Sequence, residues 1–81
     1  MFIRDTHDGR TYEGAAVEVV EEMRGESFFS TASLGEYVDG LTASIRRFRG
    51  VDLKVEGATG EEKAERLVDA MLEAGLFEHV E

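Results

Sequence analysis

The residues best suited to metal chemistry gather near the start of the chain. Asp5, His7 and Asp8 offer two carboxylates and an imidazole, which are ligands that a divalent cation accepts. Their spacing does not match a calcium-binding EF-hand loop, and Asp8-Gly9 is by itself a strong signal for a tight turn. We therefore interpret these side chains as turn residues and expect neither a metal nor another cofactor.

Catalytic chemistry finds little support elsewhere in the sequence. The two histidines, His7 and His79, lie near opposite ends of the chain, and there is no cysteine. No serine stands in a Gly-x-Ser-x-Gly context, and the stretch Gly57-Ala58-Thr59-Gly60 lacks the lysine of a phosphate-binding loop. We expect no catalytic residue and no enzyme, and a small enzyme or metal-binding protein is the third of the possible functions.

Basic residues concentrate in one stretch of the chain. Residues 41–55 carry four cations against the single carboxylate of Asp52, a local net charge of +3; the cations are Arg46, Arg47, Arg49 and Lys54. They could contact an anion, but cations in the last turn of a helix also stabilise the negative end of its dipole. At about 100° per residue, Arg46 and Arg49 fall on one flank of the helix and Arg47 on the other. We favour the structural role and keep an anion or nucleic-acid contact as the alternative function.

The overall charge restricts the partners. The 81 residues carry a net charge of −9, which repels nucleic acid and anionic membrane surfaces. No apolar run approaches the roughly 20 residues of a membrane helix, and the N-terminal residues do not form a secretory signal. We expect a cytoplasmic protein that contacts no membrane, for which nucleic acid is a disfavoured partner and a protein partner or self-association a favoured one.

The scaffold that must position these residues is predicted from turns, caps and periodicity. Residues 2–4 and 10–13 flank an Asp-Gly turn and predict a hairpin, and the alternating residues 51–56 predict a third strand. We expect a single α+β domain over residues 1–81 with two layers, in which the short three-stranded sheet is covered by three helices in the order ββααβα. The alternative is a helical bundle that carries a loosely attached hairpin.

Three apolar stripes define the predicted helices. Ser33 with Glu36 forms a capping box and Thr59 caps the third helix, whereas glycines 25, 50 and 75 are expected to end the helices. Gly25 is expected to do so in a left-handed conformation and Gly75 in a Schellman motif with Leu76, after which Phe77 is expected to pack on the core. The stripes recur at helical spacing. They comprise Ala16, Val19, Val20 and Met23; then Leu34, Tyr37, Val38, Leu41, Ile45 and Phe48; then Ala64, Leu67, Val68, Met71 and Leu72.

The remaining residues suggest a contact surface. Phe28 and Phe29 are adjacent aromatics in a connector, which either cap the open end of the domain or expose an anchor for a protein partner. Gly40 and Ser44 lie one helical turn apart beside Tyr37, where small residues admit another backbone from the same chain or from a partner. Our leading hypothesis is a non-catalytic protein–protein interaction or regulatory module, and in particular a homodimer, that uses these five residues.

The opening of the chain also carries a resemblance. The hairpin, the step Tyr12-Glu13-Gly14 and the run Val19-Val20-Glu21-Glu22-Met23 resemble small bacterial proteins of unassigned function that begin in the same way. The resemblance covers most of the length and rests on ordinary helix and turn residues. It implies no activity, substrate or functional residue.

Overall fold

The chain opens with the predicted β-hairpin in the computed structural model, which describes residues 1–26 and 33–80. Strand β1 (Phe2–Asp5) pairs antiparallel with β2 (Thr11–Glu13), and Ile3 lies opposite Tyr12. Gly9 closes the turn with φ of 80°, a left-handed conformation that glycine adopts without strain. The turn signal in the sequence therefore sets the register that buries Ile3 and Tyr12 on one face.

The third strand is not where the sequence placed it. Strand β3 (Phe77–His79) follows the last helix and pairs antiparallel with β1, which gives the sheet order β2-β1-β3 and the chain order ββαααβ. The strand predicted at residues 51–56 is wrong, since those residues have no strand partner among the described residues. Their alternation reflects burial alone: Leu53 is buried and Val51 and Val55 pack on the core.

Helix α1 (Ala16–Gly25) follows the hairpin directly. The Glu18 carboxylate accepts a hydrogen bond from the backbone N–H of Ala15 at 3.0 Å, which satisfies a donor at the start of the helix. Gly25 was predicted to end the helix in a left-handed conformation, and this prediction is wrong. Gly25 is the last residue of the helix. Glu26 has a right-handed backbone conformation and forms the cap, because its N–H donates to the carbonyls of Glu22 and Met23 in the last turn.

Helix α2 (Leu34–Arg49) begins and ends as predicted. The Ser33 Oγ accepts from the Glu36 N–H and the Glu36 carboxylate accepts from the Ser33 N–H, both at 3.2 Å, so the capping box is confirmed. At the other end, Gly50 adopts a left-handed conformation with φ of 67°.

Helix α3 (Gly60–Glu73) is also capped as predicted. The Thr59 hydroxyl accepts from the Glu62 N–H at 3.1 Å. At the C-terminus the Leu76 N–H donates to the Met71 carbonyl at 2.8 Å and the Gly75 N–H to the Leu72 carbonyl at 3.2 Å. These two bonds form the predicted Schellman motif, and they turn the chain back toward β1.

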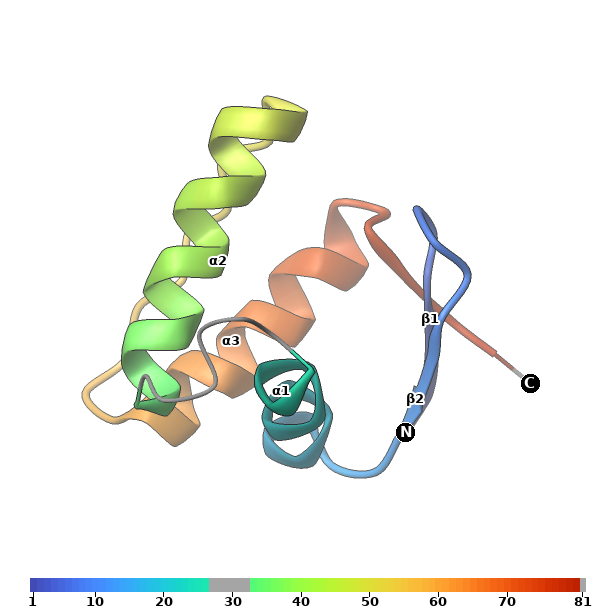
Figure 1. The fold of residues 1–81 in the computed structure, drawn as a ribbon, viewed down its shortest axis with the longest axis horizontal. Coiled ribbons are helices and arrows are strands. Elements are labelled where there is room, and N and C mark those ends of the chain that lie inside the picture. The colour runs from blue at the N-terminus through green and yellow to red at the C-terminus, as the bar shows by residue number, and fades with distance from the viewer. Residues whose placement is uncertain (27–32, 81) are drawn as a thin grey trace.

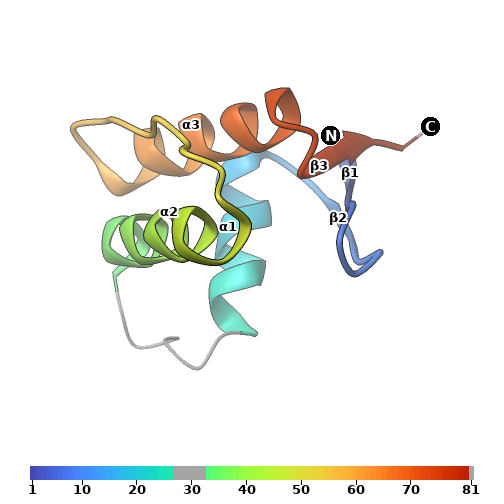
Figure 2. The ribbon, with the colours of Figure 1, turned by 90° about the horizontal axis from the view of Figure 1, so that it is seen from above.

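The helices do not all cover the sheet. Helices α1 and α3 contact the strands, whereas α2 packs on α1 and α3 and contacts no strand in the described part of the chain (Figures 1 and 2). The predicted α+β class, with three strands in one sheet and three helices, is confirmed. The simple two-layer arrangement is corrected, because α2 adds a layer on the far side of the other two helices.

One hydrophobic core joins these elements. Phe77 is 1% exposed and its ring centroid lies 6.1 Å from that of Tyr12, which locks β3 to the hairpin. The expectation that Phe77 packs on the core is therefore confirmed. The buried side chains are Ile3, Tyr12, Val19, Val20, Val38, Ile45, Leu53, Ala64, Leu67, Val68, Met71, Leu76 and Phe77. No helix in residues 1–26 and 33–80 has the length and apolarity needed to cross a membrane.

Candidate functional site

The side of α2 that faces away from α1 and α3 is an exposed helix surface without a partner in the described structure. Five residues at helical spacing are exposed along it, and we call them the outer face of α2: Glu36, Gly40, Ala43, Ser44 and Arg47. At about 100° per residue they fall within one arc, opposite the buried Val38 and Ile45. The face begins with a carboxylate, continues with three small residues and ends with a guanidinium.

Gly40 is not explained by packing within the described chain. A Cβ placed on Gly40 would meet no described atom within 4 Å, and Ser44, one turn further along, is also exposed. A glycine in a helix interior costs about 1 kcal/mol relative to alanine. The intrachain alternative for Gly40 therefore has no contact to support it, and no described residue fills the space above Gly40.

Tyr37 lies at the edge of the outer face and is half-buried against the core. Burial, followed by the charges of Tyr12 and Glu26, raises the pKa of its phenol to about 12. Tyr37, Gly40 and Ser44 thus occupy one side of α2, as predicted. Phe28 and Phe29, the other two predicted contact residues, lie outside the described residues.

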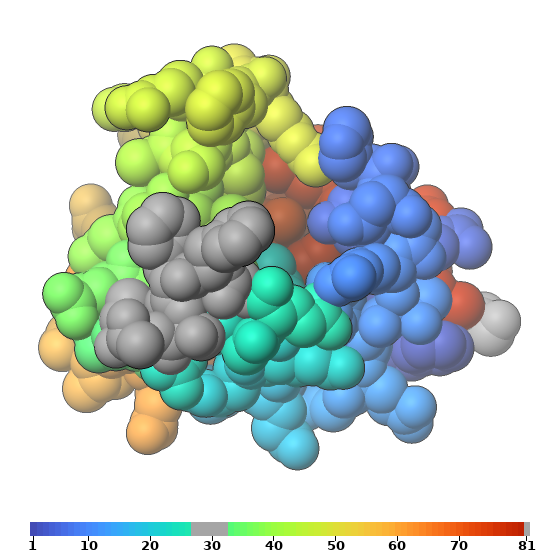
Figure 3. Space-filling model, viewed as in Figure 1, coloured from blue at the N-terminus to red at the C-terminus, as the bar shows by residue number. Residues whose placement is uncertain are grey.

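Phe48 was missed as a surface residue. The sequence placed it in the apolar stripe of α2, but its side chain is 78% exposed. The final turn of α2 extends past α1 and α3 (Figure 1), and in the space-filling view it forms an outer edge of the molecule (Figure 3). The signal was present in the sequence, because Phe48 is flanked by arginines on both sides within Arg46-Arg47-Phe48-Arg49.

The predicted basic residues lie near this exposed aromatic in the sequence. Arg46, Arg47, Arg49 and Lys54 are all exposed, and none forms an ion pair with another described residue. Arg46 lines a hollow together with Asp39 and Asp52, a hollow that Arg47 does not reach. Arg46 and Arg47 therefore lie on different sides of the helix, in line with their spacing.

The carboxylate at the start of the outer face is held in place. Hydrogen bonds from the Ser33 hydroxyl and the Ser33 backbone lower the pKa of Glu36 below its ordinary value. The carboxylate accepts from the Ser33 N–H and remains exposed to solvent. Glu36 is consequently a fixed negative charge available to a partner.

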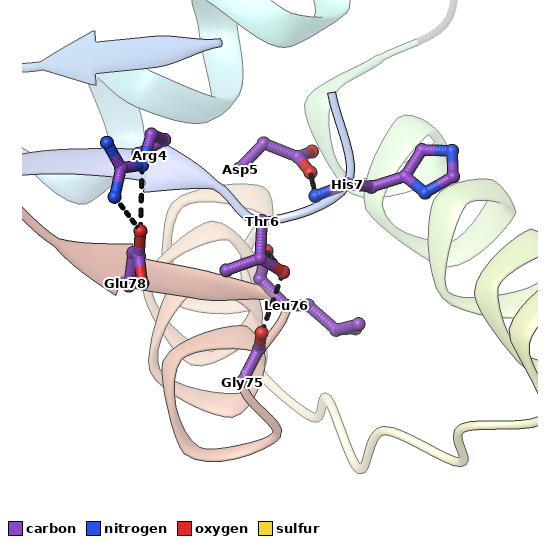
Figure 4. A network of polar contacts seen from close by, with 7 residues as sticks. All are labelled: Arg4, Asp5, Thr6, His7, Gly75, Leu76 and Glu78. Atoms are coloured by element: carbon purple, nitrogen blue, oxygen red, sulfur yellow. Dashed lines mark hydrogen bonds and ion pairs between the residues drawn. The ribbon is translucent and has the colours of Figure 1, made fainter. Parts of the chain in front are cut away.

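The carboxylates of the N-terminal cluster, Asp5 and Asp8, form hydrogen bonds within the hairpin turn. The Asp5 carboxylate accepts from the His7 N–H at 2.7 Å and the Asp8 carboxylate from the Arg10 N–H at 2.9 Å. The His7 imidazole points away from the Asp5 carboxylate (Figure 4). Among the residues that the structure describes, no three His, Cys, Asp or Glu side chains come close enough to hold a metal ion.

The neighbouring strand contacts have a structural role. The Thr6 hydroxyl donates to the carbonyl of Gly75 at 2.8 Å, and Arg4 forms an ion pair with Glu78 on β3 (Figure 4). His79 is exposed on the same strand, opposite Ile3 in the register. These contacts attach β3 to β1 and place no imidazole beside a carboxylate in a cleft.

A second hollow lies where α2 and α3 begin. It is lined by the two capping residues Ser33 and Thr59, by Leu34, Gly35 and Gly60, and by two carboxylates, Glu21 and Glu61. Helix N-termini attract anions, but both caps already accept from helix N–H groups and the carboxylates repel negative charge. This hollow has no charge that would favour an anionic ligand.

Comparison with known proteins adds no relative: no family model, curated protein or solved structure matches the chain.

Proposed function

We propose that this chain is a non-catalytic protein-interaction module that binds a protein partner through the outer face of α2 and the adjoining Phe48. The observation that carries the proposal is the 78% exposure of Phe48 next to a helix face whose small residues are open. An exposed aromatic side chain beside a surface that another backbone can approach closely is a typical anchor for a protein partner.

The charges support a protein partner. Arg47 on the outer face has no ion pair among the described residues, although the chain as a whole carries −9. An exposed cation next to an aromatic anchor steers a carboxylate-bearing surface toward it. A partner that combines an apolar patch with carboxylates fits this end of α2.

A photo-crosslinking amino acid tests the proposal in cells that naturally contain the protein. Placed at Ser44 it should give a cross-linked adduct of defined mass, and the same residue placed at Glu65, which is exposed on α3, should not. Introducing Gly40→Arg into the Ser44 probe should abolish the adduct, because the long side chain fills the open space above Gly40. Equal adducts from both positions, or none from either, would refute the proposal.

The alternative is an anion or nucleic-acid contact through Arg46, Arg47, Arg49 and Lys54. It is favoured by the exposure of all four cations and their lack of described ion pairs. It requires binding that weakens steeply as salt is added, because phosphate contacts release counterions. A fluorescence anisotropy titration with short DNA and RNA at low salt tests it, and no change in anisotropy would dismiss it.

A further inference from the structure

The charges of α2 are segregated along its length. The acidic residues Glu36 and Asp39 lie in its first half, and the three arginines occupy its final turn. On the outer face this leaves one carboxylate, Glu36, at the start and one guanidinium, Arg47, at the end. The two are separated by eleven residues, or about 16 Å along the helix axis.

The charges of one α2 helix are complementary to those of a second α2 helix that runs antiparallel to it. We propose that the partner is a second copy of this chain, docked with the two α2 helices antiparallel and related by a two-fold axis; the inference rests on the proposed function. When Gly40 faces the partner's Ala43, Glu36 faces the partner's Arg47, and the symmetry repeats each pair. A parallel arrangement would instead place Glu36 against the partner's Glu36 and Arg47 against the partner's Arg47.

The small residues allow the helices to approach in this register. Gly40, Ala43 and Ser44 occupy the middle of the outer face, where the antiparallel helices would cross. No described atom lies within 4 Å of a Cβ built on Gly40. The crossing point therefore carries no bulky side chain of α2 that would hold the two backbones apart.

The same geometry accounts for Phe48. Tyr37 and Phe48 are also eleven residues apart, which is close to three helical turns, so both lie on one flank of α2. A two-fold axis keeps that flank on the same side in both copies. Phe48 thus comes beside the partner's Tyr37, where its exposed ring is removed from water.

The pattern favours a second copy over an unrelated partner. One face of one helix supplies the carboxylate, the guanidinium, the small crossing residues and the aromatic pair, each in the position that its symmetry mate requires. The net charge of −9 on each copy opposes association. At about 0.15 M salt, however, charges more than ~8 Å apart are largely screened, whereas the close Glu36–Arg47 pairs act below that distance.

Sedimentation equilibrium on the full chain tests the arrangement. At about 0.15 M salt the wild-type chain should shift with concentration from 9.0 kDa to twice that mass. Glu36→Arg and Arg47→Glu should each weaken self-association by about tenfold, because each places like charges together twice. Mixing the two variants should restore association, because the mixed dimer regains both opposite-charge pairs.

The mixture separates this arrangement from mere loss of structure. Glu36→Arg also removes a capping interaction, so weaker self-association of this variant could come from the lost cap or from the like charges. Recovery of association on mixing with Arg47→Glu is explained only by the opposite-charge pairs between the two chains. Arg49→Glu reverses a charge in the same turn but off the outer face, and should leave association unchanged.

Two results would overturn the inference: a wild-type chain that stays at 9.0 kDa up to about 1 mM, or a mixture that does not associate more strongly than its components. A Ser44 cross-link of another mass would then still support the proposed function with a different partner.

Discussion

Gly35 and Gly60 pack backbone against backbone where α2 and α3 begin. A Cβ on Gly60 would lie 3.0 Å from the Gly35 nitrogen and 3.2 Å from the Leu34 Cβ, and one on Gly35 would lie 3.6 Å from the Gly60 Cα. This close contact accounts for a glycine in the first turn of α2. A Cβ on Gly40, by contrast, would meet no described atom within 4 Å. Close packing therefore explains the glycine at position 35 of α2 but not the one at position 40.

The glycine contact predicts opposite effects for two similar substitutions. Gly60→Ala should lower the free energy of unfolding by about 1–3 kcal/mol, because the added methyl group overpacks the helix contact. Gly40→Ala should raise it by about 0.5–1 kcal/mol, since alanine is the better helix former and the space is open. Urea denaturation followed by circular dichroism measures both, and effects of the same sign would contradict the assignment.

Helix ends provide a second matched pair. Gly75 has φ of 78° in the Schellman motif after α3, so Gly75→Ala should destabilise the protein by about 1–2 kcal/mol. Gly25 is helical and a Cβ placed on it would meet no described atom within 4 Å, so Gly25→Ala should stabilise by up to about 0.5 kcal/mol. A thermal melt of each variant measures both effects. A destabilising effect of Gly25→Ala would contradict the helical conformation and favour the left-handed cap expected from the sequence.

The two phenylalanines near the helix ends should respond differently to truncation. Phe77 is 1% exposed, and Phe77→Ala should cost about 3–5 kcal/mol of stability. Phe48 is 78% exposed, and Phe48→Ala should change stability by less than about 0.5 kcal/mol. Denaturation at low micromolar protein concentration keeps any association out of the measurement. A large loss for Phe48→Ala under these conditions would place its ring in the core.

Local signals in the sequence predicted most of the scaffold because each depends on neighbouring residues. The Ser33–Glu36 box, the Thr59 cap and the Gly75 motif form hydrogen bonds within a few positions along the chain. The hairpin turn at Asp8-Gly9 is similarly local. Such features can be read without knowing what packs against them.

The predictions that were wrong concern features that depend on contacts between distant parts of the chain. Residues 51–56 alternate because one side packs on the core, yet the place beside β1 is taken by β3. Phe48 continues the periodicity of α2 past the point where neighbouring elements can cover it. The candidate site was predicted in part, since Tyr37, Gly40 and Ser44 share a side of α2, but its aromatic anchor required the structure.

Hydrogen exchange should distinguish the true strand from the extended segment. The Phe77–His79 strand pairs with β1, whereas residues 51–57 form no backbone hydrogen bond with another described residue. We therefore expect the amides of Leu53 and Val55 to exchange at least about tenfold faster than that of Ile3 in the central strand. Exchange followed by NMR checks this, and strong protection at Leu53 would indicate a strand partner at 51–57.

Tyr37 should make stability depend on alkaline pH. Its burial raises the folded-state pKa from an ordinary value of 10.0 to about 12, so the folded chain holds the phenolic proton more tightly than the unfolded chain. The stability that this provides is complete below pH 10 and is lost as the pH rises toward 12. Denaturation at several pH values should show a shallower decline of the free energy of unfolding in this range for Tyr37→Phe than for the wild-type chain.

The ionisation of the phenol can also be followed directly by absorbance at 295 nm. The step at the highest pH should be lost in Tyr37→Phe and kept in Tyr12→Phe, which removes the other tyrosine of the chain. A wild-type Tyr37 that ionises near pH 10 would mean that the phenol is solvated and that this side of α2 is more open than the structure has it.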